Sequence, residues 1–433
     1  MKTAIVWLRN DLRFQDQESF FKACNDFDRV VAYYTFEPKE FLNTQWGIQK
    51  SGVFRIHFIL ETLAALKIEL LQKNITLIVE NKAANEGIPY WVDTINASTI
   101  FYQKEWTSEE KFVTDSLIAS LPTKVILDSH YDQFLFHPDD LPMAIDSIPE
   151  VFTFFRKQCE KLTQVRPCIS SPKLLSKDSL LNKNYPLLSL KSLGFNFFET
   201  PINTAFPFSG GTKSAIHRLD DYFWKSKRLS FYKKTRNGML GSNYSSKFSP
   251  WLANGSLSAK TIYWSVKKYE KEVHKNESTY WLIFELIWRD YFKYISLKHG
   301  TKIFQLGGIL SQKYTWKTND EIYKKWIDGK TPEPFVNANM IELKKTGFMS
   351  NRGRQNVASY FTKNMLMDWR MGAAYFEQQL IDYDVHSNWG NWMYVAGVGN
   401  DPRDRKFNIQ LQASLYDPKG TYQKKWFQNT LFK

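Results

Sequence analysis

Five short runs of β-branched and aromatic residues alternate with helical patterns near the start of the chain, and this alternation constrains the fold more than any other feature. The runs are TAIVWL (3–8), VVAYYTF (30–36), ITLIV (75–79), TIFYQ (99–103) and KVILD (124–128). Strands that alternate with helices form a parallel sheet with right-handed crossovers. The pattern therefore predicts an α/β domain over residues 1–130, with a doubly wound, Rossmann-like, five-stranded parallel sheet.

The clearest helical pattern within this domain lies at 51–74, where apolar residues recur at three- and four-residue spacing after Ser51, a possible cap. No GxGxxG motif follows the first predicted strand. The glycines of that motif let the backbone approach a pyrophosphate, so this domain is not expected to bind NAD in that manner.

Periodic patterns weaken in residues 131–204, where seven prolines are scattered through Ser- and Leu-rich sequence. We expect a connector that packs on the surface, with one helix near 151–162. Beyond it strand patterns stop, and four segments have helical spacing: 259–273, 278–299, 355–366 and 369–382. Residues 205–433 are therefore predicted to form an all-α domain.

The chain contains no apolar run near the roughly 20 residues that a bilayer span needs, so no membrane role is expected. Its N-terminus, MKTAIVWLRNDLRF, lacks the apolar region of a secretory signal. The three cysteines, Cys24, Cys159 and Cys168, form no CxxC pair. These features predict a cytoplasmic protein without a disulfide framework or a structural zinc site.

The excess of positive charge is confined to the second part of the chain. Residues 1–200 contain 22 Lys and Arg against 25 Asp and Glu, whereas 201–433 contain 36 against 19. Eleven of the fifteen tryptophans also follow residue 200. A basic, indole-rich region is typical of a nucleic-acid-binding surface, although a solvated basic face would give the same balance.

Two segments of this region have the residue types of an anion site. Ser245, Ser246, Lys247 and Ser249 precede Pro250, a residue favoured at the first position of a helix, so a phosphate could bind there. Alternatively, Ser249 is only an N-cap. In 278–294, Glu285 and Arg289 stand four residues apart among apolar neighbours, which predicts a partly buried ion pair beside Trp288. Trp288 then either stacks on a ring or packs in the core.

The densest polar stretch lies between 346 and 408. It contains amides, charges and indoles that are costly to bury without a ligand: Asn351, Arg352, Arg354, Asp382, Asp384, Asn388, Asn391 and Trp392. We expect these residues to form a pocket for an anionic redox cofactor. No histidine or third acid has the spacing for a metal site, so no metal is expected. His386 is either a proton donor or a hydrogen-bonded loop histidine.

The sequence resembles the photolyase/cryptochrome flavoproteins, and within them the DASH-type cryptochromes, over essentially the whole chain. The resemblance rests on VWLRNDLR (6–13), TRNGMLGSNYSSKFSPWLANGSLS (235–258), FELIWRDYFKY (284–294), TGFMSNRGRQ (346–355) and DYDVHSNWGNWMYVAGVGNDPR (382–403). It implies that the all-α domain binds FAD.

The resemblance implies a role for each matching position. The flavin phosphate and ribityl loop matches Tyr232, Ser245, Ser246, Lys247, Phe248 and Ser249, with Lys247 where relatives often carry Arg. The rest of the flavin pocket matches Glu285, Arg289, Asn351, Arg354, Asp382, Asp384 and Asn388. Among these, Arg354 and Asp382 are the expected ion pair beside the ring, and Asn388 is expected to face the flavin N5.

Electron transfer and substrate binding are assigned in the same way. Trp392, Trp369 and Trp316 match a three-tryptophan relay that reduces the photoexcited flavin. The pocket for a flipped pyrimidine dimer matches Trp288, Gln355 and Tyr394, with Arg403 as a further substrate contact. Glu105 and Glu109 lie where related proteins bind a folate antenna, 5,10-methenyltetrahydrofolate.

The implied activity is that of a deoxyribodipyrimidine photo-lyase: light-driven repair of cyclobutane pyrimidine dimers by electron transfer from reduced FAD, with a preference for single-stranded or looped DNA. We expect a monomer. One alternative is a blue-light signalling cryptochrome, whose members usually carry a long C-terminal extension, whereas here Lys433 follows soon after the last motif. Another is a flavin-free nucleic-acid-binding protein, which the polar cluster at 351–392 disfavours.

Overall fold

A computed structural model describes residues 1–401 and 403–428. Its N-terminal sheet has the order β3-β2-β1-β4-β5, and every pair of neighbouring strands is parallel. The strands are β1 (Thr3–Leu8), β2 (Arg29–Thr35), β3 (Thr76–Glu80), β4 (Thr99–Gln103) and β5 (Ile126–His130). The predicted doubly wound α/β domain is confirmed, and β5 starts two residues later than its apolar run.

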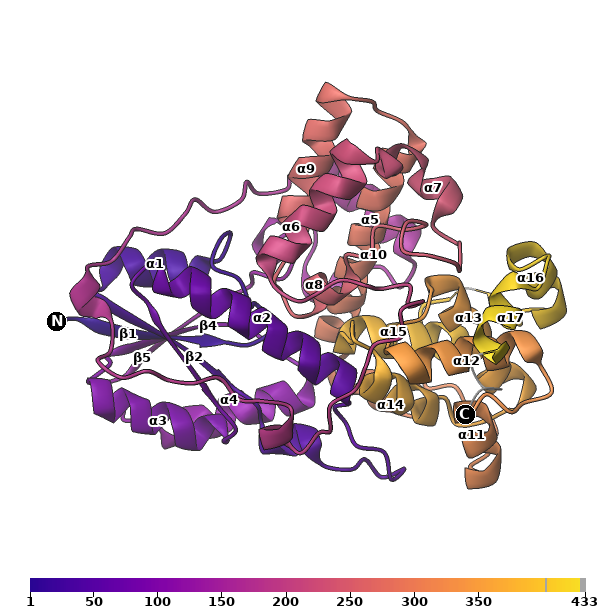
Figure 1. Cartoon of the computed structure of the whole chain (residues 1–433), viewed down its shortest axis with the longest axis horizontal. Coiled ribbons are helices and arrows are strands. Elements are labelled where there is room, and N and C mark those ends of the chain that lie inside the picture. Colours follow the sequence, from indigo (N-terminus) through magenta and orange to yellow (C-terminus); the bar gives the residue numbers. More distant parts are fainter. Residues whose placement is uncertain (402, 429–433) are drawn as a thin grey trace.

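Two pairs of helices cover the sheet, one on each face (Figure 1). Alternate residues of β1 show why: Val6 packs toward α1 (Glu18–Asp26) and α2 (Val53–Leu71). Its neighbour Trp7 packs on the other side, toward α3 (Ala84–Ile95) and α4 (Ser108–Ser120). Both faces are therefore buried, as expected of a parallel sheet.

The predicted helix cap at Ser51 is wrong, because Gly52 occupies the cap position of α2 and makes no side-chain cap bond. The Ser51 hydroxyl instead accepts a hydrogen bond of 2.6 Å from Arg55. The Gly52 N–H donates to the carbonyl of Gln378 in the second domain, at 3.0 Å. This helix start is therefore fixed by an interdomain contact.

The connector contains the predicted helix, α5 (Phe152–Leu162), but its first part does not stay on the surface. Phe134, Phe136 and Phe155 are buried in the core of the helical domain. The carboxylate of Asp290 accepts the backbone N–H groups of residues 135 and 136, at 2.8–3.0 Å. Large apolar side chains and a buried carboxylate thus draw this segment into the second domain.

The second domain is all-α in its described residues, which confirms the prediction. Its α-helices are α6 (Thr212–Asp220), α7 (Tyr232–Thr235), α8 (Ser249–Ala253), α9 (Ala259–Glu272), α10 (Glu277–His299), α11 (Asp320–Ile327), α12 (Pro334–Thr346), α13 (Asn351–Ser359), α14 (Trp369–Gln379), α15 (Val385–Ala396), α16 (Ile409–Tyr416) and α17 (Thr421–Gln428). Two π-helical turns continue α6 and α13: η6 (Asp221–Lys225) and η9 (Tyr360–Asn364).

Short 3-10 turns link several of these elements: η1 (Pro38–Phe41), η2 (Pro138–Asp140), η3 (Ile145–Ser147), η4 (Lys177–Ser179), η5 (Lys191–Leu193), η7 (Arg228–Phe231) and η8 (Gly300–Phe304). None of the helices in the described part of the chain is long and apolar enough to span a bilayer.

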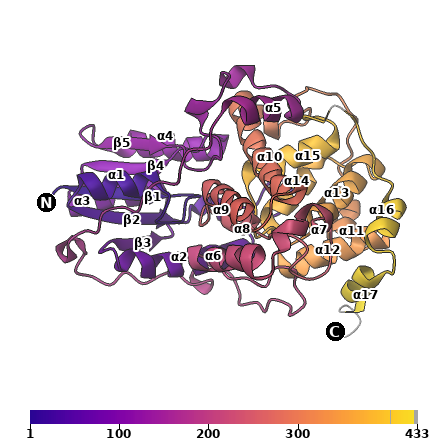
Figure 2. The ribbon, with the colours of Figure 1, turned by 90° about the horizontal axis from the view of Figure 1, so that it is seen from above.

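Helix α10 is the longest helix of the described residues and lies among the other helices of the second domain (Figure 2). Asn276 and Thr279 form a capping box at its start. The Asn276 side chain accepts the backbone N–H of Thr279, and the Thr279 hydroxyl accepts the backbone N–H of Asn276. Helices α9, α7 and α15 pack along it. Residues of α10 therefore face both the connector and the helices that carry the 346–400 stretch.

Candidate functional site

One cavity of about 480 Å³ lies in the helical domain. The loop before α8 forms one wall, α10 forms a second, and α13 and α15 complete it. It brings together sixteen of the residues singled out from the sequence: Tyr232, Ser245, Ser246, Lys247, Phe248, Ser249, Glu285, Trp288, Arg289, Asn351, Arg354, Gln355, Asp382, Asp384, Asn391 and Tyr394. Tyr232 and Tyr394 are 162 positions apart in the sequence, so it is the fold that gathers these residues.

The serine-rich loop is held by Arg218, a residue that sequence reasoning missed. Its guanidinium, 2% exposed, donates to the carbonyls of Ser242, Ser245 and Ser246 at 3.1–3.2 Å. It also pairs with Asp221 at 2.9 Å. The alternative role of Ser249 as an N-cap is wrong, because Phe248 occupies the cap position and Ser249 is the first residue of α8.

Lys247 carries a buried ammonium that has no hydrogen-bond partner. The residue is 3% exposed, and its Nζ lies 3.2 Å from the ring centre of Tyr244. Burial lowers the pKa of Lys247 well below its usual value, although the nearby Glu342 opposes this. An unpaired cation at a cavity wall is costly without an anion, so this position fits an anionic ligand.

Arg354 and Asp382 form a bidentate ion pair on the cavity wall. The Nη2 atom of Arg354 lies 2.9 Å from both carboxylate oxygens. Its Nε donates to the carbonyl of Met349 at 2.9 Å, so the guanidinium plane is fixed. The Asp382 side chain is 2% exposed. Arg354 and Asp382 therefore form the ion pair that was expected of them.

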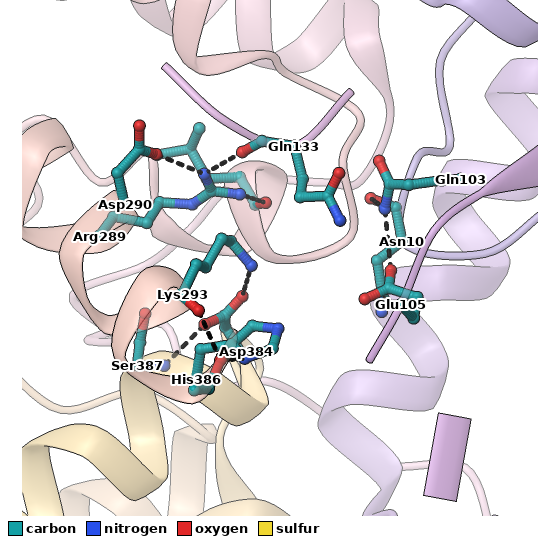
Figure 3. A network of polar contacts seen from close by, with 12 residues as sticks. Asn10, Gln103, Glu105, Gln133, Arg289, Asp290, Lys293, Asp384, His386 and Ser387 are labelled. Carbon is teal, nitrogen blue, oxygen red and sulfur yellow. Dashed lines mark hydrogen bonds and ion pairs between the residues drawn. The ribbon is translucent and has the colours of Figure 1, made fainter. Parts of the chain in front are cut away.

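Asp384 caps α15, where it accepts the Ser387 N–H at 2.7 Å, and it pairs with the buried Lys293 at 2.9 Å (Figure 3). Burial alone would raise the pKa of Asp384, but the charges of Lys293 and Arg289 lower it far below its usual value. The carboxylate is therefore charged. Lys293 was not predicted, because it stands 91 positions away in the sequence.

His386 does not line the cavity; it lies between the two domains. Its ring stacks on Trp106 at 4.5 Å, and its Nδ1 is 2.7 Å from the Ser296 hydroxyl, which also accepts the Trp106 indole N–H. Burial and the charge of Lys293 lower its pKa well below the usual value. His386 is thus a neutral histidine whose Nδ1 is hydrogen-bonded to Ser296.

The predicted ion pair between Glu285 and Arg289 is wrong. Glu285 pairs instead with Arg236 at 3.0 Å and accepts the indole N–H of Trp281. Arg289 donates to the carbonyls of Gln133 and Leu252, at 2.5 and 3.1 Å. Tertiary partners outweigh the helical spacing, since backbone carbonyls without a helix or strand partner need donors. Arg236, inside the TRNGM segment, is a cavity residue that the spacing argument missed.

The region of the cavity around Trp288 is aromatic. One face of Trp288 stacks on Phe152 of α5 at 3.6 Å, and Tyr394 meets it edge-on at 6.0 Å. The side-chain oxygen of Gln355 is buried without a hydrogen-bond partner. Arg403 is exposed and is not among the cavity residues, whereas Arg405 is.

The three tryptophans Trp392, Trp369 and Trp316 each lie against, in or next to the start of α14. The Trp392 indole packs so closely on α14 that a Cβ at Gly372 would lie 2.2 Å from it. Trp369 begins α14 and is fully buried. Trp316 is partly buried, and the backbone of its neighbour Lys317 bonds to Leu366 and Asp368, directly before Trp369.

Besides the three relay tryptophans and Arg403, the predicted residues Asn388, Glu105 and Glu109 also lie away from the cavity lining. Asn388 is buried, and its amide donates to the carbonyl of Ala373 at 3.0 Å. Glu105 belongs to the N-terminal domain, where it accepts from Gln103 at 2.8 Å and faces the helical domain (Figure 3). Glu109 is 72% exposed and pairs with Lys50.

In comparisons with known proteins, both domains match models of the photolyase family. A family model described as DNA photolyase matches residues 4–173, and one described as FAD binding domain of DNA photolyase matches residues 281–430. Cryptochrome DASH of Gloeobacter violaceus is 48% identical over 427 residues, which cover 98% of this chain and 85% of that protein. Cryptochrome DASH of Danio rerio is 42% identical over 430 residues, covering 98% and 83%.

Solved structures extend this similarity to three dimensions. The structure of Synechocystis sp. PCC6803 cryptochrome matches with a TM-score of 0.94 at 44% identity, over 99% of this chain and 89% of that one. The structure of a bacterial class III photolyase from Agrobacterium tumefaciens matches with a TM-score of 0.82 at 25% identity, over 99% and 87%.

Proposed function

Because this chain belongs to the photolyase/cryptochrome family, and within it to the DASH cryptochromes, we propose that it is a deoxyribodipyrimidine photo-lyase. Its proposed substrate is a cyclobutane pyrimidine dimer in single-stranded or looped DNA. One observation carries this proposal: a single cavity holds both the charged groups suited to a flavin and the aromatic groups suited to a flipped base.

The cavity fits FAD, the cofactor whose binding domain the chain contains. The unpaired ammonium of Lys247 suits a phosphate, and the serine loop fixed by Arg218 supplies hydroxyls beside it. The Arg354–Asp382 pair presents a donor and an acceptor at fixed positions for the flavin ring. When bound and reduced, FAD supplies a light-driven electron to the dimer and takes it back after the ring opens.

The protein's own part in repair is to bind, orient and exclude water. Trp288 lines the cavity, where it can stack on a flipped pyrimidine, while Phe152 packs on one of its faces. Gln355 supplies an unsatisfied acceptor for a base N–H. Taking a base out of the stack costs least in single strands, which supports the proposed preference.

We also propose that Trp392, Trp369 and Trp316 carry electrons between the cavity and the surface. Their order of burial, from fully enclosed Trp369 and nearly enclosed Trp392 to partly exposed Trp316, suits a path that ends at solvent. Asn388 stays a proposed flavin contact, because it sits on α15 one turn from Asp384.

The proposed DNA partner accords with the charge distribution. The excess of Lys and Arg lies after residue 200, in the domain that contains the cavity. Arg405, at the cavity, and the neighbouring Arg403 are exposed, where each could neutralise a phosphate. Glu105 and Glu109 stay proposed contacts of a folate antenna; Glu105 bonds to Asn10 and Gln103, at the ends of β1 and β4.

The test is repair itself. The flavin-loaded protein, reduced and kept anaerobic, is illuminated with blue light in the presence of a dimer in a single strand, in a loop and in a duplex. Restored pyrimidines in the first two, at a faster rate than in the duplex, support the proposal. Bound FAD and normal photoreduction without repair of any substrate would favour a blue-light receptor instead.

A further inference from the structure

Tyr314 lies beside the outermost tryptophan of the proposed relay. Its ring centre is 5.7 Å from that of Trp316, with the two planes at 75°. Tyr314 is 39% exposed, whereas Trp316 is partly buried. A reductant in solution therefore reaches the phenol more readily than the indole.

Trp316 and Trp369 have no base for their N–H protons. The Trp316 Nε1 is buried without a hydrogen-bond partner. The Trp369 Nε1 donates to the carbonyl of Leu306 at 3.0 Å, and a carbonyl does not accept the proton outright. An oxidised Trp316 thus stays a radical cation, which remains a strong oxidant of any neighbour that can release a proton.

Tyr314 has such a base. Its hydroxyl donates to the Oδ2 of Asp404 at 3.3 Å. Lys363 pairs with the same carboxylate and lies 5.1 Å from the centre of the Tyr314 ring. Burial and the charge of Asp404 raise the pKa of Tyr314, so the phenol keeps its proton at neutral pH until it is oxidised.

We propose that Tyr314 is a fourth member of the relay, with Asp404 as its proton acceptor. One electron passes from Tyr314 to the Trp316 radical cation, which returns to the neutral indole. The phenolic O–H bond breaks, its proton forms the carboxylic acid of Asp404, and a neutral tyrosyl radical remains. This step rests on the proposed function only in that the tryptophan relay supplies the oxidised Trp316.

The consequence is a longer-lived separation of charge. Return of an electron alone does not restore Tyr314, because the phenol re-forms only when the proton also comes back from Asp404. The surface radical then persists until an external thiol or similar one-electron donor reduces it.

The test is time-resolved absorption and electron paramagnetic resonance of protein radicals after a blue flash on the flavin-loaded protein. The expected result is a tryptophan radical cation that decays as a tyrosyl radical appears. Tyr314→Phe should abolish the tyrosyl signal and prolong the tryptophan signal, and Asp404→Asn should slow the conversion. Tyr280→Phe is the matched control, since Tyr280 is 37% exposed and bonded to the Glu160 carboxylate at 2.7 Å, outside the relay.

The outcomes separate the two proposals. Tryptophan radicals without a tyrosyl radical, or a tyrosyl signal unchanged in Tyr314→Phe, overturn the role of Tyr314 and leave the relay in place. Absence of any tryptophan radical overturns the relay and this step with it, whether or not dimers are repaired. Bound-flavin absorbance and circular dichroism of each variant establish that it is folded.

Discussion

The Nη2 atom of Arg354 lies 2.9 Å from each carboxylate oxygen of Asp382, in a pair whose acid is almost completely buried. The two residues come from α13 and the turn before α15, so the pair joins two walls of the cavity. A charge pair in this position fixes the shape of the site and also its electrostatics, because neither group can move without leaving the other unpaired.

Asp382→Asn should therefore destabilise the protein and weaken FAD retention together. Removing one partner of a buried pair costs about 3–5 kcal/mol, since the remaining charge is left uncompensated. Urea unfolding and flavin content after gel filtration measure the two effects. The control is Glu277→Gln, which breaks the exposed pair with Lys233 and should change neither. An Asp382→Asn protein as stable as the parent would show that the pair contributes little.

FAD retention should fall with rising pH, through Lys247. In the empty cavity the pKa of Lys247 is lowered by burial, and a bound phosphate raises it, so binding takes up a proton. The affinity for FAD is then highest below the pKa that Lys247 has in the empty cavity. It is lost as the pH rises through the higher pKa that Lys247 has in the complex. Dilution of flavin-loaded protein at pH 7 to 10, with free FAD followed by fluorescence, measures this.

Variants at the same position give the control. Lys247→Arg should bind FAD with little pH dependence over this range, because a guanidinium stays charged. Lys247→Met should lose affinity by about tenfold or more, the loss of one charge-assisted contact. If the Arg variant follows the same pH curve as the parent, another group is responsible.

Trp392→Phe should slow the photoreduction of oxidised flavin while FAD stays bound. A phenyl ring is much harder to oxidise than an indole, so the first step of the proposed relay fails, yet the ring still fills the space against Gly372. Flavin absorbance under continuous blue light, with a thiol present, gives the rate. Trp426→Phe replaces an equally buried indole on α17 and should leave the rate unchanged. An unaltered rate in Trp392→Phe would remove it from the relay.

Periodicity alone predicted the strands and the long helices, because alternation and three- to four-residue spacing are local properties. It failed at Glu285 and Arg289, where the helical spacing was right but Arg236 and two backbone carbonyls were the actual partners. No local pattern marks Lys293 as the partner of Asp384 either.

The tryptophan relay illustrates the same limit. Trp316, Trp369 and Trp392 are 53 and 23 positions apart, and only the resemblance to a known family connected them. Their neighbour Tyr314 and its bond to Asp404 join residues 90 positions apart, which only the folded chain reveals. Local sequence patterns thus predicted the helices and strands, whereas tertiary contacts determine which residues meet in the functional site.

Trp288→Ala should weaken binding of a dimer-containing single strand by about tenfold or more, because a base stacked on an aromatic ring contributes roughly 1–3 kcal/mol. An undamaged strand, held through phosphates, should bind as before. Phe152→Leu should give a smaller loss, since Phe152 only packs on one face of Trp288, and an aromatic pair contributes about 0.5–1.5 kcal/mol. Fluorescence anisotropy with labelled strands measures both. Trp264→Ala, which removes an exposed indole outside the cavity lining, is the control. Equal losses for damaged and undamaged strands in Trp288→Ala would place this residue in general DNA binding rather than in reading the lesion.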